Sequence, residues 1–161
     1  MSTSNLFDSH CHLHFAQYDR DREEVINRLK EADIKVINVG TDLEDSKKAI
    51  DLAKKYPDQM WATVGAHPVD SAASDFNAAE YKKLAEDNSV VAIGECGLDY
   101  YHGTRNMKHG IGVKDRQKEI FVKQIELAKE LNKPLMIHCR PEEGNNAYLD
   151  LLEILKFKNL N

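Results

Sequence analysis

Apolar residues in this chain form short runs that alternate with longer segments of helical spacing. The short runs predict buried strands at 35–40, 60–65, 90–97 and 134–140. The longer segments carry apolar residues three and four positions apart, which predicts amphipathic helices at 19–33, 43–56, 77–88, 115–131 and 147–157. Strands that alternate with helices of this length form βαβ units and a parallel sheet.

The opening segment, residues 5–15, predicts one more strand in front of the others. Side chains alternate between the two faces of a strand, so three histidines share one face: His10, His12 and His14. Two imidazoles two residues apart on a strand can chelate one cation. A polar strand edge with scattered histidines would show the same pattern, so the choice depends on ligand-type residues elsewhere in the chain.

The predicted fold class is α/β, with about five β/α units in a TIM-type (β/α) arrangement. Polar residues end every strand, and (β/α) barrels place their chemistry at those ends. No Gly-x-Gly-x-x-Gly follows a strand, so a dinucleotide-binding fold has no support. A barrel closes with about eight strands. We therefore expect residues 1–161 to form one domain, a partial, open barrel with sequential strands and the first and fifth at its edges.

Ligand-type side chains gather at the carboxyl ends of these strands: His10, His12, His67, Glu95 and His138. Glu95 follows an apolar run, and a buried charge needs a partner or a metal. His138 falls at the same level, although a satisfied core histidine would also fit there. His67 by itself would be interpreted as a turn histidine before proline. Together the five side chains predict one pocket.

The three cysteines test this assignment, because each stands next to a candidate ligand. Alternation turns Cys11, Cys96 and Cys139 away from the ligand face, where free cysteines act as small buried apolar residues. The rival interpretation, a thiolate zinc site, would need all three to face the other way. Their odd number, without a Cys-x-x-Cys pair, favours a reducing cytoplasm over a disulfide framework.

Candidate substrate contacts lie beyond the ligands. Arg140 shares the face of His138 nearer the pocket mouth, where an arginine suits a phosphate or a carboxylate. Residues 99–113 predict a long polar loop, and such loops are often functional, although a solvated surface is an equal alternative. In this loop Asp99 and Arg105 are candidates for substrate contacts, and Tyr100 or Tyr101 for stacking on a base.

Charge and hydropathy narrow the classes of function. The formal net charge is −5, whereas a protein that holds nucleic acid by surface charge alone is usually basic. A phosphate substrate would therefore need bound cations and a few local basic groups. No apolar run approaches the ~18 residues of a membrane span, and the first residues lack a secretory pattern.

Five segments of the chain resemble the TatD-related metal-dependent DNases, in the order of that family: 7–13 (FDSHCHL), 39–42 (VGTD), 65–68 (GAHP), 93–100 (IGECGLDY) and 134–140 (PLMIHCR). The resemblance implies a (β/α)₈ barrel that cleaves DNA phosphodiesters with two divalent metal ions, such as Zn, Mn or Mg. It implies metal ligands at His10, His12, Glu95 and His138, with Glu95 shared between the two metals. It also implies substrate contacts at His67 and Arg140.

The chain departs from the family pattern in three places. His14 stands where the family usually has Asp or Asn, and residues 141–146 separate Arg140 from the next helix. The family also continues through three more strands, which bring a further histidine ligand and an aspartate. Without them we expect weak activity, and we expect self-association or completion by a C-terminal portion.

Three functional hypotheses remain open from the sequence. The first is a nuclease in which Glu95 and His138 belong to the catalytic centre and single-stranded DNA ends are the substrate. The second is a hydrolase of small phosphoesters or amides on the same metal site. The third is a partial barrel that binds metal without catalysis.

Overall fold

The computed structural model describes residues 6–71, 76–105, 112–144 and 146–158. Its five strands are β1 (Leu6–Cys11), β2 (Ile34–Val39), β3 (Met60–Val64), β4 (Val90–Asp99) and β5 (Leu135–Arg140). All neighbouring pairs are parallel, in the order β1-β2-β3-β4-β5. The expected sequential, open sheet is therefore confirmed, with β1 and β5 as its edges.

The helices are α1 (Arg22–Glu31), α2 (Leu43–Lys55), α3 (Pro68–Ser71), α4 (Ala78–Ala85), α5 (Tyr100–Arg105), α6 (Val113–Glu130) and α7 (Ala147–Phe157), with a 3₁₀ turn, η1, at Ala16–Tyr18. Asp42, Asn77 and Asn146 accept backbone N–H groups as N-caps of α2, α4 and α7. These polar caps explain why three predicted helices begin within one residue of the positions expected from the sequence.

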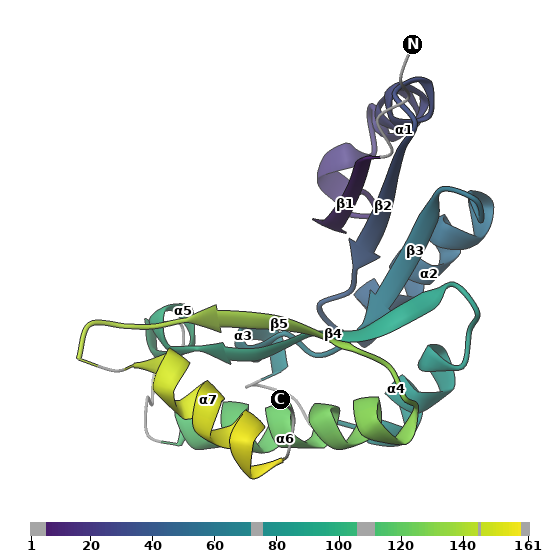
Figure 1. Cartoon of the computed structure of the whole chain (residues 1–161). Helices are drawn as coiled ribbons and strands as arrows, with labels where there is room; N and C mark the ends of the chain where they lie inside the picture. The colour runs from purple at the N-terminus through teal and green to yellow at the C-terminus, as the bar shows by residue number, and fades with distance from the viewer. Residues whose placement is uncertain (1–5, 72–75, 106–111, 145, 159–161) are drawn as a thin grey trace.

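The sheet is strongly curved, and its long helices cover the outer side (Figure 1). One arm holds β1, β2 and β3 with α1 and α2, and the other holds β4 and β5 with α6 and α7. A large apolar cluster lies between the sheet and α1, α2, α4 and α6, and a smaller one lies under α6 and α7. Within the described part of the chain, none of the long helices covers the inner side of the sheet (Figure 1).

Besides the short helix α3 and the 3₁₀ turn η1, which no pattern predicted, two segments differ from the sequence predictions. The predicted loop at 99–113 begins as an extension of β4 and continues as α5, and residues 106–111 lie outside the described part of the chain. The opening strand ends at Cys11, and the backbone N–H of Phe15 bonds to the carbonyl of His12 in a turn. Residues 12–15 therefore lie beyond the strand, so strand alternation does not set the positions of His12 and His14.

Glycine lets β4 and β5 approach closely at the level of the site. Gly97 has a φ of +136°, and a Cβ built there would lie 2.0 Å from the carbonyl oxygen of His138. No side chain fits in that space, so glycine is needed for this pairing of the two strands.

Among the described residues, no helix is long and apolar enough to cross a membrane.

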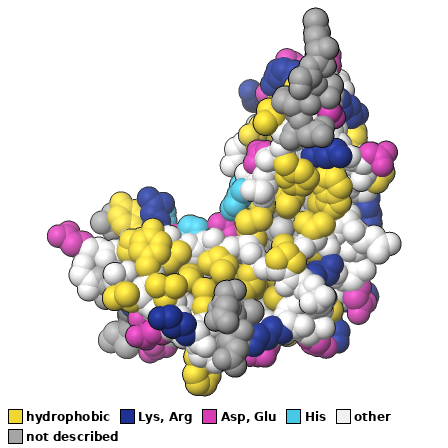
Figure 2. All heavy atoms as spheres, viewed as in Figure 1, with side chains coloured by type: hydrophobic (Ala, Val, Ile, Leu, Met, Phe, Trp, Pro, Cys, Tyr) yellow, Lys and Arg dark blue, Asp and Glu magenta, His cyan; other side chains and the backbone are white. Residues whose placement is uncertain are grey.

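Apolar side chains of α7 remain exposed beside the open edge of β5. Leu149 is 58% exposed, Leu152 49% and Phe157 82%, and Figure 2 shows apolar side chains spread over this side of the molecule. An uncovered sheet edge beside an apolar face favours pairing with another chain. We expect concentration-dependent self-association in sedimentation velocity, weakened in a Leu149→Ser/Leu152→Ser variant. A Glu153→Ala variant is the control, and a wild-type chain that is monomeric at every concentration would contradict this prediction.

Candidate metal and substrate site

The site lies in the inner corner between the two arms, where histidine and acidic side chains show on the surface (Figure 2). Backbone bonds draw the strand ends together there. The N–H of Glu95 donates to the carbonyl of Gly40 at 2.8 Å, and the N–H of His67 donates to the carbonyl of Thr41 at 2.7 Å. The segment after β2 therefore fixes the ends of β3 and β4 relative to each other.

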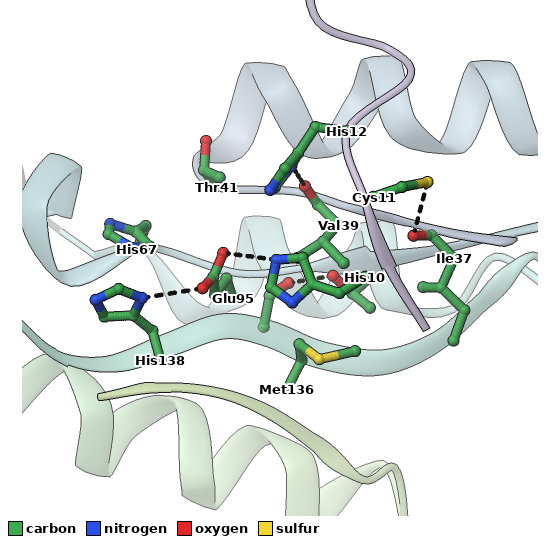
Figure 3. Close-up of polar contacts among 12 residues, drawn as sticks. His10, Cys11, His12, Ile37, Val39, Thr41, His67, Glu95, Met136 and His138 are labelled. Atoms are coloured by element: carbon green, nitrogen blue, oxygen red, sulfur yellow. Dashed lines mark hydrogen bonds and ion pairs between the residues drawn. The ribbon is translucent and has the colours of Figure 1, made fainter. Parts of the chain in front are cut away.

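Glu95 stands at the centre of the site (Figure 3). It is 7% exposed, with Oε2 3.3 Å from His10 Nε2 and Oε1 3.1 Å from His138 Nδ1. Burial by itself raises the pKa of this carboxyl, but the hydrogen bond from His138 and the nearby His67 and His10 lower it overall. Glu95 is therefore held as a carboxylate between imidazoles from both arms.

Two groups of possible ligand atoms share this carboxylate. One consists of His10, His12 and Glu95, and the other of His67, Glu95 and His138. Within each group the ligand atoms all lie within 4.8 Å of one another. Imidazole nitrogens with a carboxylate oxygen are a donor set that zinc, manganese and iron accept. The residues present thus fit a divalent cation on each side of Glu95.

The ring of His12 is oriented by the backbone of β2. Its Nδ1 lies 2.8 Å from the carbonyl oxygen of Val39, so Nδ1 carries the proton and Nε2 keeps its lone pair. Burial lowers the pKa of His12, which keeps the ring neutral. A neutral imidazole whose other nitrogen donates to a carbonyl is typical of a metal ligand.

His138 is held between two carboxylates. Its Nδ1 faces Glu95, and its Nε2 lies 2.9 Å from Oδ2 of Asp99, which is 1% exposed. Burial lowers the pKa of His138, but hydrogen bonds to Glu95 and Asp99 raise it overall. Asp99 also accepts from the N–H and from Nδ1 of His102. Nothing local in the sequence marks His102 as a partner of Asp99, so His102 was not among the predicted site residues.

His67 follows β3 and packs edge-on against His138, with ring centroids 4.4 Å apart. The N–H of Val69 donates to its Nδ1 at 3.3 Å, which leaves Nε2 as the protonated nitrogen. Burial, with the nearby His138, lowers the pKa of His67 from 6.5 to about 4. The ring is therefore neutral at physiological pH.

The depressed pKa of His67 predicts acid sensitivity of the metal-free fold. His67 binds a proton near pH 6.5 in the unfolded chain and only near pH 4 in the folded chain. Its contribution to the free energy of unfolding is therefore complete above pH 6.5 and is lost as the pH falls from 6.5 to 4. In a His67→Asn variant the acid-induced loss of the free energy of unfolding should be smaller by up to about 3 kcal/mol. Urea titrations of both proteins at stepped pH measure it. Parallel pH profiles for the two proteins would contradict the prediction.

Arg140 is the last residue of β5, and its guanidinium lies above an aromatic ring. Its guanidinium carbon is 4.8 Å from the ring centroid of Tyr101, which contacts His102 edge-on. The other tyrosine lies elsewhere: Tyr100 is 2% exposed, packs under α7 and donates to Asp150 at 2.6 Å. The side chain of Arg105 lies outside the described part of the structure.

Tyr100 faces outward because β4 extends through Asp99. Alternation along this longer strand sends Glu95 and Asp99 inward and Cys96 and Tyr100 outward. The same pattern was available in the sequence, but the predicted strand stopped at Gly97. The structure therefore does not bring Tyr100 to the pocket.

The cysteines face away from the site, as expected. Cys11 Sγ donates to the carbonyl of Ile37 at 3.3 Å and points away from the pocket (Figure 3). Cys96 is fully buried in the smaller apolar cluster, and Cys139 packs against that cluster. Among the residues that the structure describes, neither candidate metal group includes a sulfur.

Among the described residues His14 lies outside both candidate ligand groups, although its ring centroid is 5.9 Å from that of His12. It is 6% exposed, and its Nε2 lies 3.0 Å from Oδ2 of Asp45. The same oxygen of Asp45 accepts from the N–H of Thr41 at 3.0 Å. His14 thus links the turn after β1 to the first turn of α2.

Comparison with known proteins identifies the family. Residues 7–160 match the family described as TatD related DNase. The chain belongs to the TatD-related DNase family. The chain is 42% identical over 153 residues to YabD of Bacillus subtilis, a protein named as an uncharacterized metal-dependent hydrolase. It is 36% identical over 150 residues to a protein of Erwinia tasmaniensis named 3'-5' ssDNA/RNA exonuclease TatD.

A solved structure supports the TatD fold. The crystal structure of YjjV, a TatD homologue from Escherichia coli K12, matches with a TM-score of 0.79 at 28% identity. The match covers 98% of this chain and 57% of YjjV. The chain covers 55% of YabD and 54% of the Erwinia protein. It therefore spans little more than half the length of these TatD relatives.

Proposed function

We propose that this chain is a metal-dependent phosphodiesterase that acts on single-stranded DNA ends and holds one cation on each side of Glu95. The observation that carries the proposal is the position of Glu95, whose two oxygens face histidines from opposite arms. The names of the relatives, a metal-dependent hydrolase and an ssDNA/RNA exonuclease, support the reaction class and the substrate.

In this proposal each residue of the donor set has a role. His10, His12 and Glu95 would hold one cation. Glu95 and His138 of the second group would hold the other, whereas His67, whose Nδ1 accepts the N–H of Val69 and whose Nε2 keeps its proton, would face the substrate. Bound there, the cations would lower the pKa of a water to give the nucleophile and offset the negative charge of a phosphodiester. The backbone carbonyl of Val39 and the carboxylate of Asp99 orient the rings of His12 and His138.

The remaining side chains fit a phosphate substrate. His67 stays neutral and keeps a proton on Nε2, so it can donate a hydrogen bond to a phosphate oxygen without repelling a cation. The guanidinium of Arg140 matches two phosphate oxygens. Tyr101 lies beside Arg140 and offers an aromatic surface for a terminal base.

A nuclease assay tests this function. The wild-type chain is incubated with Mn²⁺ or Zn²⁺ and a single-stranded oligonucleotide labelled at its 5' end, with EDTA as the control. Stepwise shortening that requires metal supports the proposal. Cleavage of p-nitrophenyl phosphate with no action on DNA would favour the hydrolase of small phosphoesters. Metal binding in calorimetry without turnover on either substrate would favour a partial barrel that binds metal only.

A further inference from the structure

Two glutamines on α6 are buried against the outer side of the sheet. Gln117 is 1% exposed and Gln124 is fully buried, although both lie on the apolar face of the helix. A buried amide is costly unless its oxygen and its nitrogen both find partners. The partners of these two side chains are backbone groups at the ends of β3 and β4.

Gln124 binds both backbone groups of Ala66. Its Oε1 accepts the N–H of Ala66 at 2.8 Å, and its Nε2 donates to the carbonyl of Ala66 at 2.9 Å. Ala66 directly precedes His67. The helix therefore fixes the peptide from which the His67 ring extends into the site.

Gln117 binds Asp99 with the same geometry. Its Oε1 accepts the N–H of Asp99 at 2.9 Å, and its Nε2 donates to the carbonyl of Asp99 at 2.9 Å. The carboxylate of Asp99 in turn faces Nε2 of His138. This contact connects α6 to a candidate metal ligand through a single residue.

We propose that Gln117 and Gln124 are positioning residues: Gln117 sets His138 through Asp99, and Gln124 sets His67 through Ala66. The two are seven residues apart, which is about 10.5 Å along a helix. One rigid helix thus fixes the ends of β3 and β4 at a constant separation. The inference rests on the proposed function for its catalytic meaning, but the positioning itself concerns the metal-free protein.

The test compares Gln117→Met with Gln124→Met, each serving as the matched control of the other. Methionine keeps the length of the side chain and removes both hydrogen bonds. Imidazole ¹⁵N resonances are recorded on the metal-free protein. We expect Gln117→Met to shift the ring of His138 and leave His67 unchanged, and Gln124→Met to do the reverse. A Phe121→Leu variant, also buried on α6, controls for general loss of packing.

Metal affinity is the second readout. Calorimetry with Mn²⁺ should show binding about 10- to 100-fold weaker in Gln117→Met, as for other residues that support a ligand, and within about twofold of wild type in Gln124→Met. If the methionine variants fail to fold, Gln117→Glu and Gln124→Glu carry the same comparison, because they keep the acceptor for the backbone N–H.

Two outcomes separate the inference from the proposed function. Unchanged ring resonances of His67 and His138 in variants that are merely less stable would overturn the positioning role. A wild-type chain that binds no Mn²⁺ would contradict the proposed function, while the ring resonances of the metal-free protein would still decide the role of the glutamines.

Discussion

Replacing Glu95 by glutamine is expected to abolish metal-dependent activity and to remove the strongest metal binding. Glu95 supplies a carboxylate to both candidate groups, and an amide neither carries the charge nor bridges two cations well. Loss of a residue that only supports a ligand costs about 10- to 100-fold in affinity or activity, so loss of the shared ligand should cost at least about 100-fold. Calorimetry with Mn²⁺ and the oligonucleotide assay measure the two effects.

The control for this prediction is Glu153→Gln, which removes the same charge from an exposed position on α7. It should bind metal and turn over substrate like the wild type. A Glu95→Gln variant must also be shown to fold, by its circular dichroism and thermal transition. If that folded variant bound Mn²⁺ with wild-type stoichiometry and affinity, Glu95 would not be the shared ligand.

Adding the part of the TatD barrel that this chain does not span is expected to raise its activity. The test fuses this chain to the part of Bacillus subtilis YabD that lies C-terminal to the matched region. That matched region is 42% identical to this chain and covers 55% of YabD. The resemblance to the family implies that the added strands carry a further histidine ligand and an aspartate. We expect at least a tenfold gain in metal-dependent turnover, since a missing ligand partner typically costs that much.

The same fusion should cover the exposed apolar side chains. β5 is an open edge, and Ile137 on that strand is 39% exposed. The fused strands would pair with this edge, so the fusion should sediment as a monomer at concentrations where the short chain associates. In a control fusion the added histidine and aspartate are replaced by alanine. This control still covers the edge of β5 but supplies no further ligands, so it separates the two effects. Equal turnover by a monomeric short chain and by the intact fusion would contradict the prediction.

Local pattern was enough to predict most of the architecture. Apolar spacing gave the helix at 147–157 with the bounds that α7 has, and it gave the order and direction of all five strands. Alternation within a strand placed the cysteines away from the pocket, because the face of a side chain depends only on its parity along that strand. Where a strand runs further than expected, a residue assigned to the following loop is misplaced, as happened with Tyr100.

Contacts between distant segments depended on the tertiary structure. The pairing of His138 with Asp99 joins residues 39 positions apart, and that of Gln124 with Ala66 joins residues 58 apart. The register shifts on either side of β4 set which residues meet across the sheet. By itself the sequence determined the main strands and helices, the order of the strands and the outward face of the three cysteines. Only the packed sheet decided the partners of the site residues, because a hydrogen bond between distant residues requires a register and a helix position that no local pattern encodes.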